Sequence, residues 1–598
     1  MDRYFKHCAF IQAILALSLF FTLSASATAV QQLETVMPVR SCASLGSLNL
    51  SQETGAMVRI TGATALNTPQ GTFCKISAKL SPDIGVEVAL PQAKWTQRML
   101  QVGCGGLCGN INLSLSNASG CVPAMNGEFA VAATDMGHAG SMMDASWAED
   151  PQKRIDFAYR ANHLTAQFTK ALTAAYYGQR PRYAYFMGCS DGGREALTEA
   201  QRYPDDFNGI SAGAPAAWFS MQNSFFHGWN VIANLRPDGT PVLLKNRLPL
   251  LHKAVIAHCP TLSGINDGIL QNPFACTFSR SWVKTCAPDQ QERGDCFTSE
   301  ELDVVEKLYQ GARGSNGEQF APAGLPLGSE LRWPVPATAT GRSMSEMMAL
   351  PALQYVLLPG GKQPFSKVSD FAFNSQNFAK VAELAPLYNA TNTDLQAFAA
   401  AGGKLIVWHG LADDSISPAG TVAWFRGVQD LMGTDKVDHF MRLFLLPGVA
   451  HCGNGEGPDQ VDLLTALMNW TEQETAPDKL IVGKSVNTDA MPPVPPPATA
   501  AGMTPPAQDA SVQFHGLQKP GQPVAQAAEK VIYTRPVFPF PYIARYNGKG
   551  DVNNALNYVA VKSDGYNNIR LKKPVSDMYG PDNQRNYRVV DGKLVMSK

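Results

Sequence analysis

The most constraining feature of this sequence is a serine placed in a sharp turn between a strand-like and a helix-like segment. Residues 188–192 read Gly-Cys-Ser-Asp-Gly, which fits the pattern Gly-x-Ser-x-Gly and centres on Ser190. An apolar run at 183–187 precedes the turn, and a helix-like run at 194–202 follows it. Glycines beside a serine let a strand turn abruptly into a helix, which exposes the hydroxyl at the end of a sheet. The pattern predicts a nucleophilic serine; the alternative is a serine in an ordinary strand-to-helix turn.

Similar short apolar runs alternate with helical patterns over much of the chain. Apart from 183–187, the runs that we predict as strands are 84–90, 99–102, 129–133, 404–408 and 440–446. A helix is predicted over 155–177, and another begins at Ser417 and Pro418 and ends at Gly433. Strands that alternate with helices are typical of a domain with a mainly parallel sheet. The order therefore predicts an α/β fold.

One long segment breaks this alternation. Residues 216–393 contain four cysteines and many glycines and prolines, and they include a helix start at which Thr298 and Glu301 form a capping box. A disulfide-rich block inserted into an α/β domain is typical of a lid. We therefore predict a lid domain at 216–393, inserted between two parts of a catalytic domain at 40–215 and 394–560.

The chain ends and one internal stretch have compositions of their own. Residues 1–27 combine a basic start, a short apolar core and small residues before a cleavage site, as a secretory signal peptide does. The alternative, an uncleaved anchor helix, is disfavoured because the apolar run is short for a membrane span. Residues 491–523 are proline-rich and predict an exposed loop within the catalytic part, and residues 561–598 form a polar, basic C-terminal extension.

These features predict where the protein acts and which partners it lacks. Export gives a secreted or periplasmic location, with no membrane contact after the signal is cleaved. The formal net charge is −1, which gives no electrostatic reason to expect a nucleic-acid partner. The sequence predicts no oligomeric state.

The cysteine count indicates a disulfide framework with one cysteine left over. Loss of Cys8 with the signal leaves eleven of the twelve cysteines, an odd number. Neighbouring positions predict the pairs Cys42–Cys74, Cys259–Cys276 and Cys286–Cys296. One of Cys104, Cys108 and Cys121 must then remain unpaired. No histidine with metal-ligand spacing accompanies the cysteines, so a zinc site is not predicted.

A serine nucleophile needs a general base, and His451 is the best-placed histidine. It follows the predicted strand at 440–446 and a Pro-Gly turn, so it lies on a loop at a strand end. Cys452 follows it directly, as Cys189 directly precedes Ser190. A Cys189–Cys452 disulfide would hold their Cα atoms about 5.5–6 Å apart. The alternative is two unrelated buried thiols.

The acid that orients the base should follow the predicted strand at 404–408. Asp413 and Asp414 both lie on the next loop, and spacing does not separate them. His409, at the strand end, is a second base candidate, although a hydrogen-bonded structural histidine is the favoured interpretation. For an oxyanion hole, one N–H is expected from Asp191 and another from the glycine-rich loop at 103–106. A simple flexible turn is the alternative for that loop.

Together these motifs resemble the tannase and feruloyl esterase family of α/β-hydrolases over roughly residues 42–558. The resemblance rests on the segments 185–195, 408–413 and 446–452. It implies an α/β-hydrolase fold with a large lid that makes most substrate contacts. The triad that it implies is Ser190, Asp413 rather than Asp414, and His451, with oxyanion donors at Asp191 and at Cys104 or Gly105.

The substrate class also comes from this resemblance alone. It implies a small aromatic ester as the partner, with a phenolic acyl group such as a gallate or hydroxycinnamate. The family extends to a bacterial hydrolase of mono(2-hydroxyethyl) terephthalate. No matching carboxylate-binding arginine can be placed in this lid, so the terephthalate activity is not the favoured one.

The chain departs from the family at a calcium loop of the type C-D-x-x-D-G-x-x-D-G. Pro260 and Ser263 stand where two carboxylates are usual. Asp267 with the carbonyls of Ile265 and Ile269 would bind calcium weakly at best, because calcium needs several charged oxygen ligands. We therefore expect no required cofactor and only a doubtful calcium site.

The resulting hypothesis is a secreted serine ester hydrolase that works through an acyl-enzyme. One alternative is a serine peptidase or acyltransferase on the same fold. Another is a hydrolase-like binding protein without activity, which the complete set of Ser190, Asp413 and His451 argues against.

Overall fold

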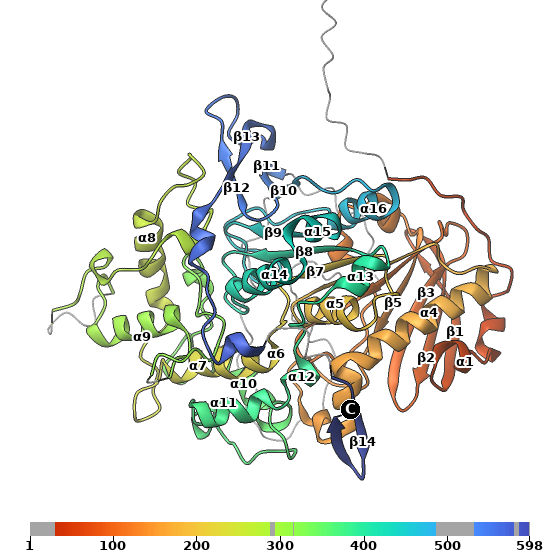
Figure 1. Ribbon diagram of the computed structural model, residues 1–598, viewed down its shortest axis with the longest axis horizontal. Helices are drawn as coiled ribbons and strands as arrows, with labels where there is room; N and C mark the ends of the chain where they lie inside the picture. The colour runs from red at the N-terminus through yellow and green to blue at the C-terminus, as the bar shows by residue number, and fades with distance from the viewer. Residues whose placement is uncertain (1–29, 288–293, 315, 486–530, 579–584, 597–598) are drawn as a thin grey trace, which may run out of the picture.

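A nine-stranded sheet runs through the centre of the computed structural model (Figure 1). The structure describes residues 30–287, 294–314, 316–485, 531–578 and 585–596. In spatial order the strands are β1 (Val58–Thr68), β2 (Gly71–Leu80), β3 (Ile84–Pro91), β5 (Phe129–Thr134), β4 (Arg98–Val102), β6 (Tyr183–Cys189), β7 (Gly209–Gly213), β8 (Lys404–Gly410) and β9 (Met441–Leu446). From β5 to β9 neighbouring strands are parallel, whereas β1, β2 and β3 pair antiparallel. The predicted α/β fold with a mainly parallel sheet is confirmed.

All six apolar runs predicted as strands lie in this sheet, and β1, β2 and β7 are additions to the prediction. The predicted helix at 155–177 is α3 (Pro151–Ile155) continued through a wider turn into α4 (Ala161–Tyr177). The helix capped by Ser417 is α14 (Pro418–Met432), and it ends at Gly433 as predicted.

Helices cover both faces of the sheet. Alternate residues along a strand point to opposite faces, so Phe186 packs into the core to which α4 and α14 also contribute. Its neighbours Tyr185 and Met187 pack into a second core on the other face. That second core is closed by α16 (Leu463–Gln473). The functional loops therefore emerge from the end of a sheet that is packed on both sides.

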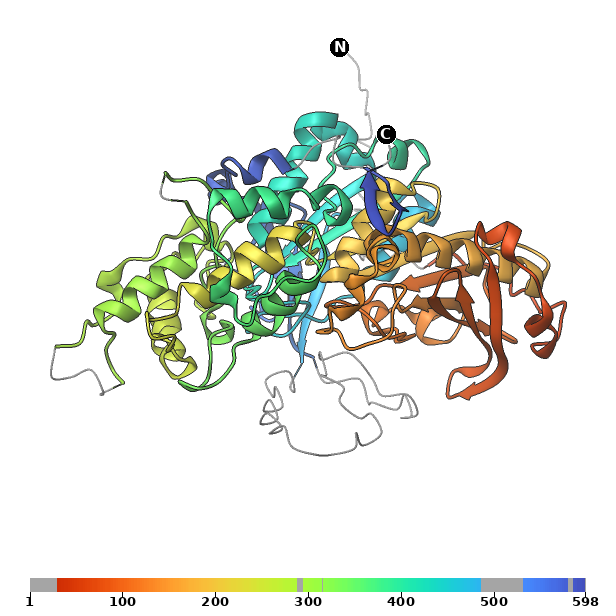
Figure 2. The same ribbon diagram turned by 90° about the horizontal axis from the view of Figure 1, so that it is seen from below.

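Residues 216–393 add no strand to this sheet among the residues described. Their helices are α6 (Phe219–Met221), α7 (His227–Ile232), α8 (Leu248–His258), α9 (Ser299–Gln310), α10 (Met344–Tyr355), α11 (Ser375–Ala382) and α12 (Ala385–Tyr388). The capping box of Thr298 and Glu301 is present at the start of α9. Figures 1 and 2 show α8 and α9 at the opposite end of the molecule from β1 and β2.

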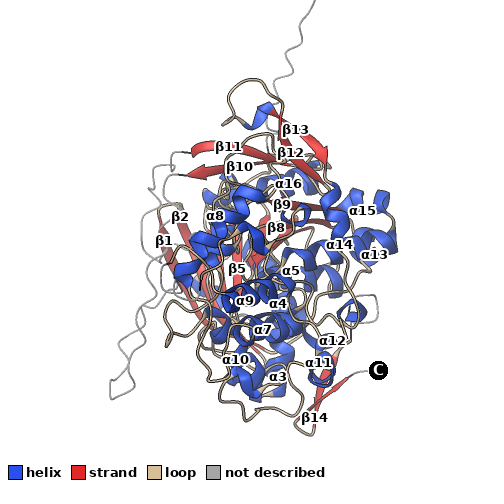
Figure 3. Ribbon diagram, turned by 90° about the vertical axis from the view of Figure 1, so that its left-hand side faces the viewer, coloured by secondary structure: helices blue, strands red, loops and turns tan. Residues whose placement is uncertain are grey.

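Shorter elements complete the fold. The remaining helices are α1 (Ser51–Thr54), α2 (Val122–Met125), α5 (Asp191–Arg202), α13 (Gln396–Ala400) and α15 (Thr434–Phe440). Three further strand pairs lie outside the main sheet, and Figure 3 shows two of them together beyond β9. The pairs are β10 (Leu480–Ser485) with β11 (Val531–Val537), β12 (Tyr542–Tyr546) with β13 (Tyr558–Lys562), and β14 (Tyr587–Val590) with β15 (Lys593–Met596).

The C-terminal extension packs back onto the helical segment. The side chains of Tyr566 and Val575 are buried, and the Gln319 N–H donates to the carbonyl of Lys573. The predicted signal peptide at 1–27 and proline-rich loop at 491–523 lie outside the described residues. None of the helices described is both long and apolar enough to span a membrane.

The structure contains five disulfides. Four are the pairs anticipated from the sequence, namely Cys42–Cys74, Cys189–Cys452, Cys259–Cys276 and Cys286–Cys296. The fifth joins Cys104 to Cys108, which leaves Cys121 as the free, buried cysteine of the described chain.

Candidate active site

Ser190 lies at a strained turn between β6 and α5. Its backbone has φ 66° and ψ −121°, in a region that residues other than glycine rarely adopt. The turn closes tightly, because a Cβ on Gly188 would lie 2.3 Å from the carbonyl oxygen of Gly192. A Cβ on Gly193 would lie 2.2 Å from the carbonyl oxygen of Gly213. These glycines are what allow the serine to stand at the end of the sheet.

The side chains of Ser190, His451 and Asp413 form one continuous hydrogen-bonded row. The Nε2 atom of His451 is 2.9 Å from Oγ of Ser190. The Nδ1 atom of the same ring is 2.9 Å from Oδ2 of Asp413. Three segments far apart in the sequence thus bring together the residues that were selected as nucleophile, base and acid.

The surroundings of Asp413 keep it ionised. Burial alone would raise its pKa, but the nearby charge on His451 and hydrogen bonds from His409 and His451 outweigh burial, so the pKa is lowered. Its other oxygen, Oδ1, accepts the N–H groups of Ser415 and Ile416, each at 2.8 Å. The carboxylate is therefore fixed in both charge and orientation.

The charge of Asp413 in turn stabilises the protonated form of His451. Burial lowers the pKa of this imidazole, but the negative charge and hydrogen bond of Asp413 raise it more, so the pKa stands above its ordinary value. An imidazole that is readily protonated in place suits a group that accepts the proton of a serine.

His409 and Asp414 were the other candidates for the base and the acid. Neither forms a hydrogen bond with His451 among the residues described. The Nε2 atom of His409 lies 3.1 Å from Oδ2 of Asp413 and 3.0 Å from the Ile416 carbonyl, and its Nδ1 lies 2.9 Å from the Thr421 hydroxyl. His409 therefore contacts Asp413, and it makes no hydrogen bond to Ser190 among the residues described. For Asp414, burial and the charge of Asp413 raise the pKa to about 7.

The Cys189–Cys452 disulfide joins the residue before Ser190 to the residue after His451. Its Cα atoms are 5.9 Å apart, although the cysteines are 263 positions apart in the chain. The bond ties the end of β6 to the loop after β9. Without it, packing and the hydrogen bond between Ser190 and His451 would hold the two loops together.

Asp191 has its side chain turned into the protein. Its carboxylate forms a two-point ion pair with Arg194, at 2.6 and 3.0 Å, and neither side chain is exposed to solvent. Arg194 also donates to the carbonyls of Phe157 and Ala158. As the first residue of α5, Asp191 has a backbone N–H with no acceptor inside the helix. This N–H is therefore available at the end of the helix that carries the serine.

The second oxyanion candidate lies on the loop after β4. The Cys104 N–H points to Oε1 of Glu195 at 3.3 Å, so it is already directed to an acceptor. The Gly105 N–H has no hydrogen-bond partner in the part of the chain that the structure describes. Of the two positions considered from the sequence, the geometry leaves Gly105 as the available donor.

The helical segment at 216–393 contacts both the loop that carries Asp413 and the loop that follows His451. Gln222 donates to the carbonyl of Ser415, two residues after Asp413. His252 lies between Glu330, at 2.7 Å, and Glu456 on the loop after His451, at 2.9 Å. Burial lowers the pKa of His252, but the two carboxylates raise it more, to about 9.

His227, in α7, is a buried histidine beside the acid loop that sequence reasoning did not select. Burial, followed by the charge on His451, lowers its pKa to about 3, so it is neutral. Its Nδ1 lies 3.0 Å from the hydroxyl of Ser345. Among ten histidines, no local pattern distinguishes this position in the sequence.

The residues of the doubtful calcium site are engaged with protein groups. Oδ2 of Asp267 lies 3.3 Å from the guanidinium of Arg535, and its Oδ1 accepts the N–H of Ile269. The carbonyl of Ile265 accepts the hydroxyl of Ser263 at 2.9 Å. One carboxylate that is already paired with a cation does not fit the ligand set of calcium.

Another group with metal-binding chemistry lies near the serine. Cys104, Cys108, Asp191 and Glu195 lie close enough together to share an ion. The two cysteines form a disulfide, however, so no thiolate is present to act as a ligand.

We predict that a chelator changes the thermal stability little. If the guanidinium of Arg535 already neutralises Asp267, removing free calcium takes away no stabilising ion. The measurement is the melting temperature with and without excess chelator. A decrease of more than about 5 °C would contradict this prediction, because it would require a bound ion that stabilises the folded chain.

The comparisons with known proteins agree on one family. A family model described as "Tannase and feruloyl esterase" matches residues 68–561. The chain is 30% identical over 520 residues to a probable feruloyl esterase of Arthroderma benhamiae, a match that covers 82% of this chain and 86% of the relative. It is 27% identical over 571 residues to the mono(2-hydroxyethyl) terephthalate hydrolase of Piscinibacter sakaiensis, with 83% and 86% of the two chains covered.

A solved structure shares the fold. Feruloyl esterase B from Aspergillus oryzae matches with a TM-score of 0.68 at 24% sequence identity, over 84% of this chain and 97% of that one. The similarity extends over most of the chain.

Proposed function

The chain belongs to the tannase and feruloyl esterase family and is a carboxylic ester hydrolase, and from this premise we propose that it cleaves esters of phenolic or aromatic acids through an acyl-enzyme on Ser190. The observation that carries the proposal is the row from Ser190 through His451 to Asp413, with both hydrogen bonds at 2.9 Å. The aromatic acyl group is inferred from the names of relatives that are feruloyl esterases.

In the proposed mechanism, His451 accepts the proton of Ser190 while the serine oxygen attacks the ester carbonyl. Asp413 stabilises the imidazolium that forms. The backbone N–H groups of Asp191 and Gly105 stabilise the negative oxygen of the tetrahedral intermediate. His451 then protonates the departing alcohol, and water, activated by the same imidazole, releases the acid from Ser190.

We further propose that residues 216–393 act as a lid domain that bounds the substrate site. The support is that Gln222 contacts the acid loop and His252 contacts Glu456, on the loop of the base. A segment that touches both loops is well placed to set the shape of the entrance.

Export from the cytoplasm is also part of the proposal. The basic and apolar start of the sequence supports a signal peptide at 1–27. The five disulfides of the described chain support an oxidising compartment, where such bonds persist.

A small substrate panel tests the function. Methyl gallate, methyl ferulate and mono(2-hydroxyethyl) terephthalate would be compared by kcat/KM, with an anilide of an aromatic acid as the amide control. We expect a phenolic ester to be preferred over the terephthalate ester by at least about tenfold. Hydrolysis of the anilide alone would favour a peptidase, and binding without hydrolysis would favour a non-catalytic protein.

The Cys189–Cys452 disulfide leads to a separate prediction. We expect the double variant Cys189→Ala/Cys452→Ala to fold and to lose at least about tenfold in kcat, because a displacement of about 1 Å between base and nucleophile can cost a hundredfold in rate. The matched control is Cys286→Ala/Cys296→Ala in the lid segment, which should lose less. Recovery of Cys189 and Cys452 as free thiols from fully active enzyme would contradict the prediction.

A further inference from the structure

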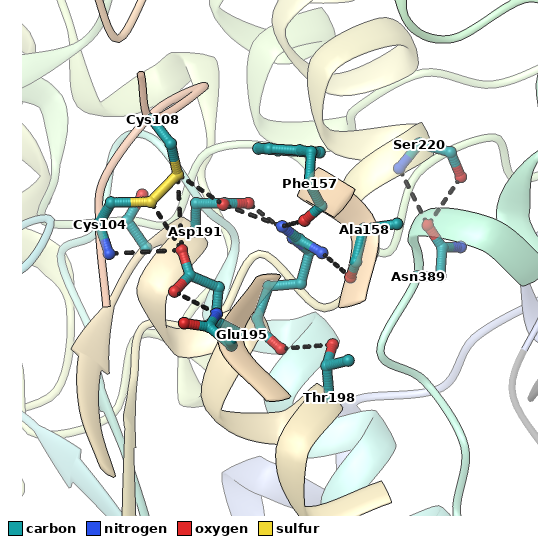
Figure 4. A network of polar contacts seen from close by, with 12 residues as sticks. Cys104, Cys108, Phe157, Ala158, Asp191, Glu195, Thr198, Ser220 and Asn389 are labelled. Atoms are coloured by element: carbon teal, nitrogen blue, oxygen red, sulfur yellow. Dashed lines mark hydrogen bonds and ion pairs between the residues drawn. A yellow bond between two sulfur atoms is a disulfide. The ribbon is translucent and has the colours of Figure 1, made fainter. Parts of the chain in front are cut away.

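The loop that follows β4 is held against the first turn of α5 by two features that the proposed mechanism does not use. One is the disulfide between Cys104 and Cys108. The other is the carboxyl group of Glu195, which is buried and lies beneath the loop (Figure 4). We call residues 103–106 the oxyanion loop, because they include Gly105, the proposed N–H donor.

The loop and the helix touch backbone to backbone. A Cβ on Gly103 would lie 2.7 Å from Cα of Gly192, and a Cβ on Gly192 would lie 2.8 Å from the carbonyl oxygen of Cys104. On the other side, the nearest atom to a Cβ on Gly105 would be Cε of Met142, 3.7 Å away. The start of the loop is therefore fixed by contact, whereas packing constrains Gly105 much less.

A chain of buried hydrogen bonds reaches this loop from the sheet. The Gln101 side chain on β4 donates to Oδ1 of Asn162 at 2.9 Å, and Asn162 donates to Oε2 of Glu195 at 2.8 Å. The other oxygen of Glu195, Oε1, accepts the Cys104 N–H at 3.3 Å. Both oxygens of Glu195 thus act as acceptors, and they connect α4 and α5 to the oxyanion loop.

The disulfide packs on the same carboxyl group. Sγ of Cys104 lies 2.8 Å and Sγ of Cys108 lies 3.5 Å from Oε1 of Glu195. Because disulfide sulfurs carry no proton, these are packing contacts and not hydrogen bonds. Burial, followed by the charge of Asp191, raises the pKa of Glu195, whereas the charge of Arg194 and the hydrogen bonds from Asn162 and from the Cys104 N–H lower it.

The short span of this disulfide points to a local role. It joins cysteines only four positions apart, so it removes little conformational freedom from the unfolded chain. What it does fix is the path of residues 104–108, in which Cys108 itself has a positive φ of 61°. Gly105 lies within that closed loop.

We propose that the Cys104–Cys108 disulfide and the Glu195 carboxyl group position the oxyanion loop, so that the Gly105 N–H is held in place to bind the negative oxygen of the tetrahedral intermediate. The proposal rests on the acyl-transfer function proposed above. The three side chains are positioning residues, because they act through the backbone of Gly105 and do not touch the substrate.

This role has a kinetic signature that general stabilisation lacks. A donor that acts mainly on the tetrahedral intermediate lowers the barrier of the chemical step without tightening substrate binding equally. Loosening the loop should therefore lower kcat and leave KM almost unchanged. It should also weaken the binding of a tetrahedral boronate formed on Ser190, since that adduct places an oxygen in the same position.

The experiment compares Cys104→Ala/Cys108→Ala with Cys286→Ala/Cys296→Ala, which also opens a short disulfide loop. For the first variant we expect kcat to fall about tenfold, KM to stay within about twofold, and the inhibition constant of phenylboronic acid to rise about tenfold. The control variant should lose less than about threefold in kcat and in boronate affinity. Glu195→Met is a second variant that keeps a side chain of similar size and leaves the disulfide in place. It should change kcat and boronate affinity in the same direction, because its thioether offers no oxygen to the Cys104 N–H or to the Asn162 side chain.

Three outcomes would overturn the proposal. The first is wild-type kcat and boronate affinity in the folded Cys104/Cys108 variant. The second is an equal loss in the lid control. If the first variant does not fold, the third is wild-type kcat and boronate affinity in Glu195→Met. Failure of the proposed function is distinguishable, because the wild-type enzyme would then neither hydrolyse esters nor react with a fluorophosphonate at Ser190.

Discussion

Replacement of Ser190 by alanine is expected to lower ester hydrolysis by at least about a thousandfold while the chain remains folded. The oxygen removed is the one that lies 2.9 Å from Nε2 of His451. No other hydroxyl group forms a hydrogen bond with this imidazole among the residues described. The measurement is kcat/KM on the best ester of the panel, together with the melting temperature. Loss of one small polar side chain should change stability far less than activity.

The matched control for this variant is Ser415→Ala, on the acid loop. Ser415 supplies a backbone N–H to Asp413, and an alanine keeps that group, so activity should stay within about tenfold of wild type. Residual esterase activity above about a thousandth of wild type in Ser190→Ala, in a preparation free of other esterases, would remove Ser190 as the nucleophile.

The second large effect is expected for Asp413→Asn. Oδ1 of Asp413 accepts two backbone N–H groups, so the carbonyl oxygen of an asparagine must take that position. Its NH2 group then faces His451, which has to accept a hydrogen bond at Nδ1 and carry its proton on Nε2. In that tautomer the imidazole cannot accept the proton of Ser190. We expect kcat to fall on the order of 10³–10⁴-fold, with little change in KM.

Asp414→Asn is the matched control, because it makes the same chemical change one position along the chain. Asp414 has no hydrogen bond to the imidazole of His451 among the described contacts, so its loss should change kcat by less than about tenfold. A larger effect from Asp414→Asn than from Asp413→Asn would reverse the assignment of the acid. The pair of variants therefore tests a choice that spacing in the sequence left open.

Much of the sheet could be predicted because its central strands are buried on both faces. Runs such as 129–133 and 405–408 are continuously apolar for that reason. The strand β7 (Gly209–Gly213) escaped prediction because all its residues except Ile210 are small. A Cβ on Gly213 would lie 2.3 Å from the ring of Trp408, so close packing of the neighbouring strand requires glycine there. A search for runs of large apolar residues does not find a strand that is made mostly of small residues.

The site was predictable where local chemistry leaves a pattern. The turn around Ser190 carries its glycines, and Cys189 and Cys452 mark the two loops that have to meet. The role of Glu195 was not predictable, because it depends on how β4, α4 and α5 pack, and its neighbours in sequence do not reveal that packing. The pairing of Cys104 with Cys108 was one of the arrangements left open, and only the shape of the loop distinguishes them.

The most direct test of the central claim is to trap the acyl-enzyme. The wild-type protein would be mixed with the p-nitrophenyl ester of a hydroxycinnamic acid, quenched in acid within the first turnovers, digested and analysed by mass spectrometry. We expect one added acyl group, on the peptide that contains Ser190, and none in the Ser190→Ala variant. An acyl group on another residue, or rapid hydrolysis with no acyl group on the protein at any time during a pre-steady-state burst, would contradict it.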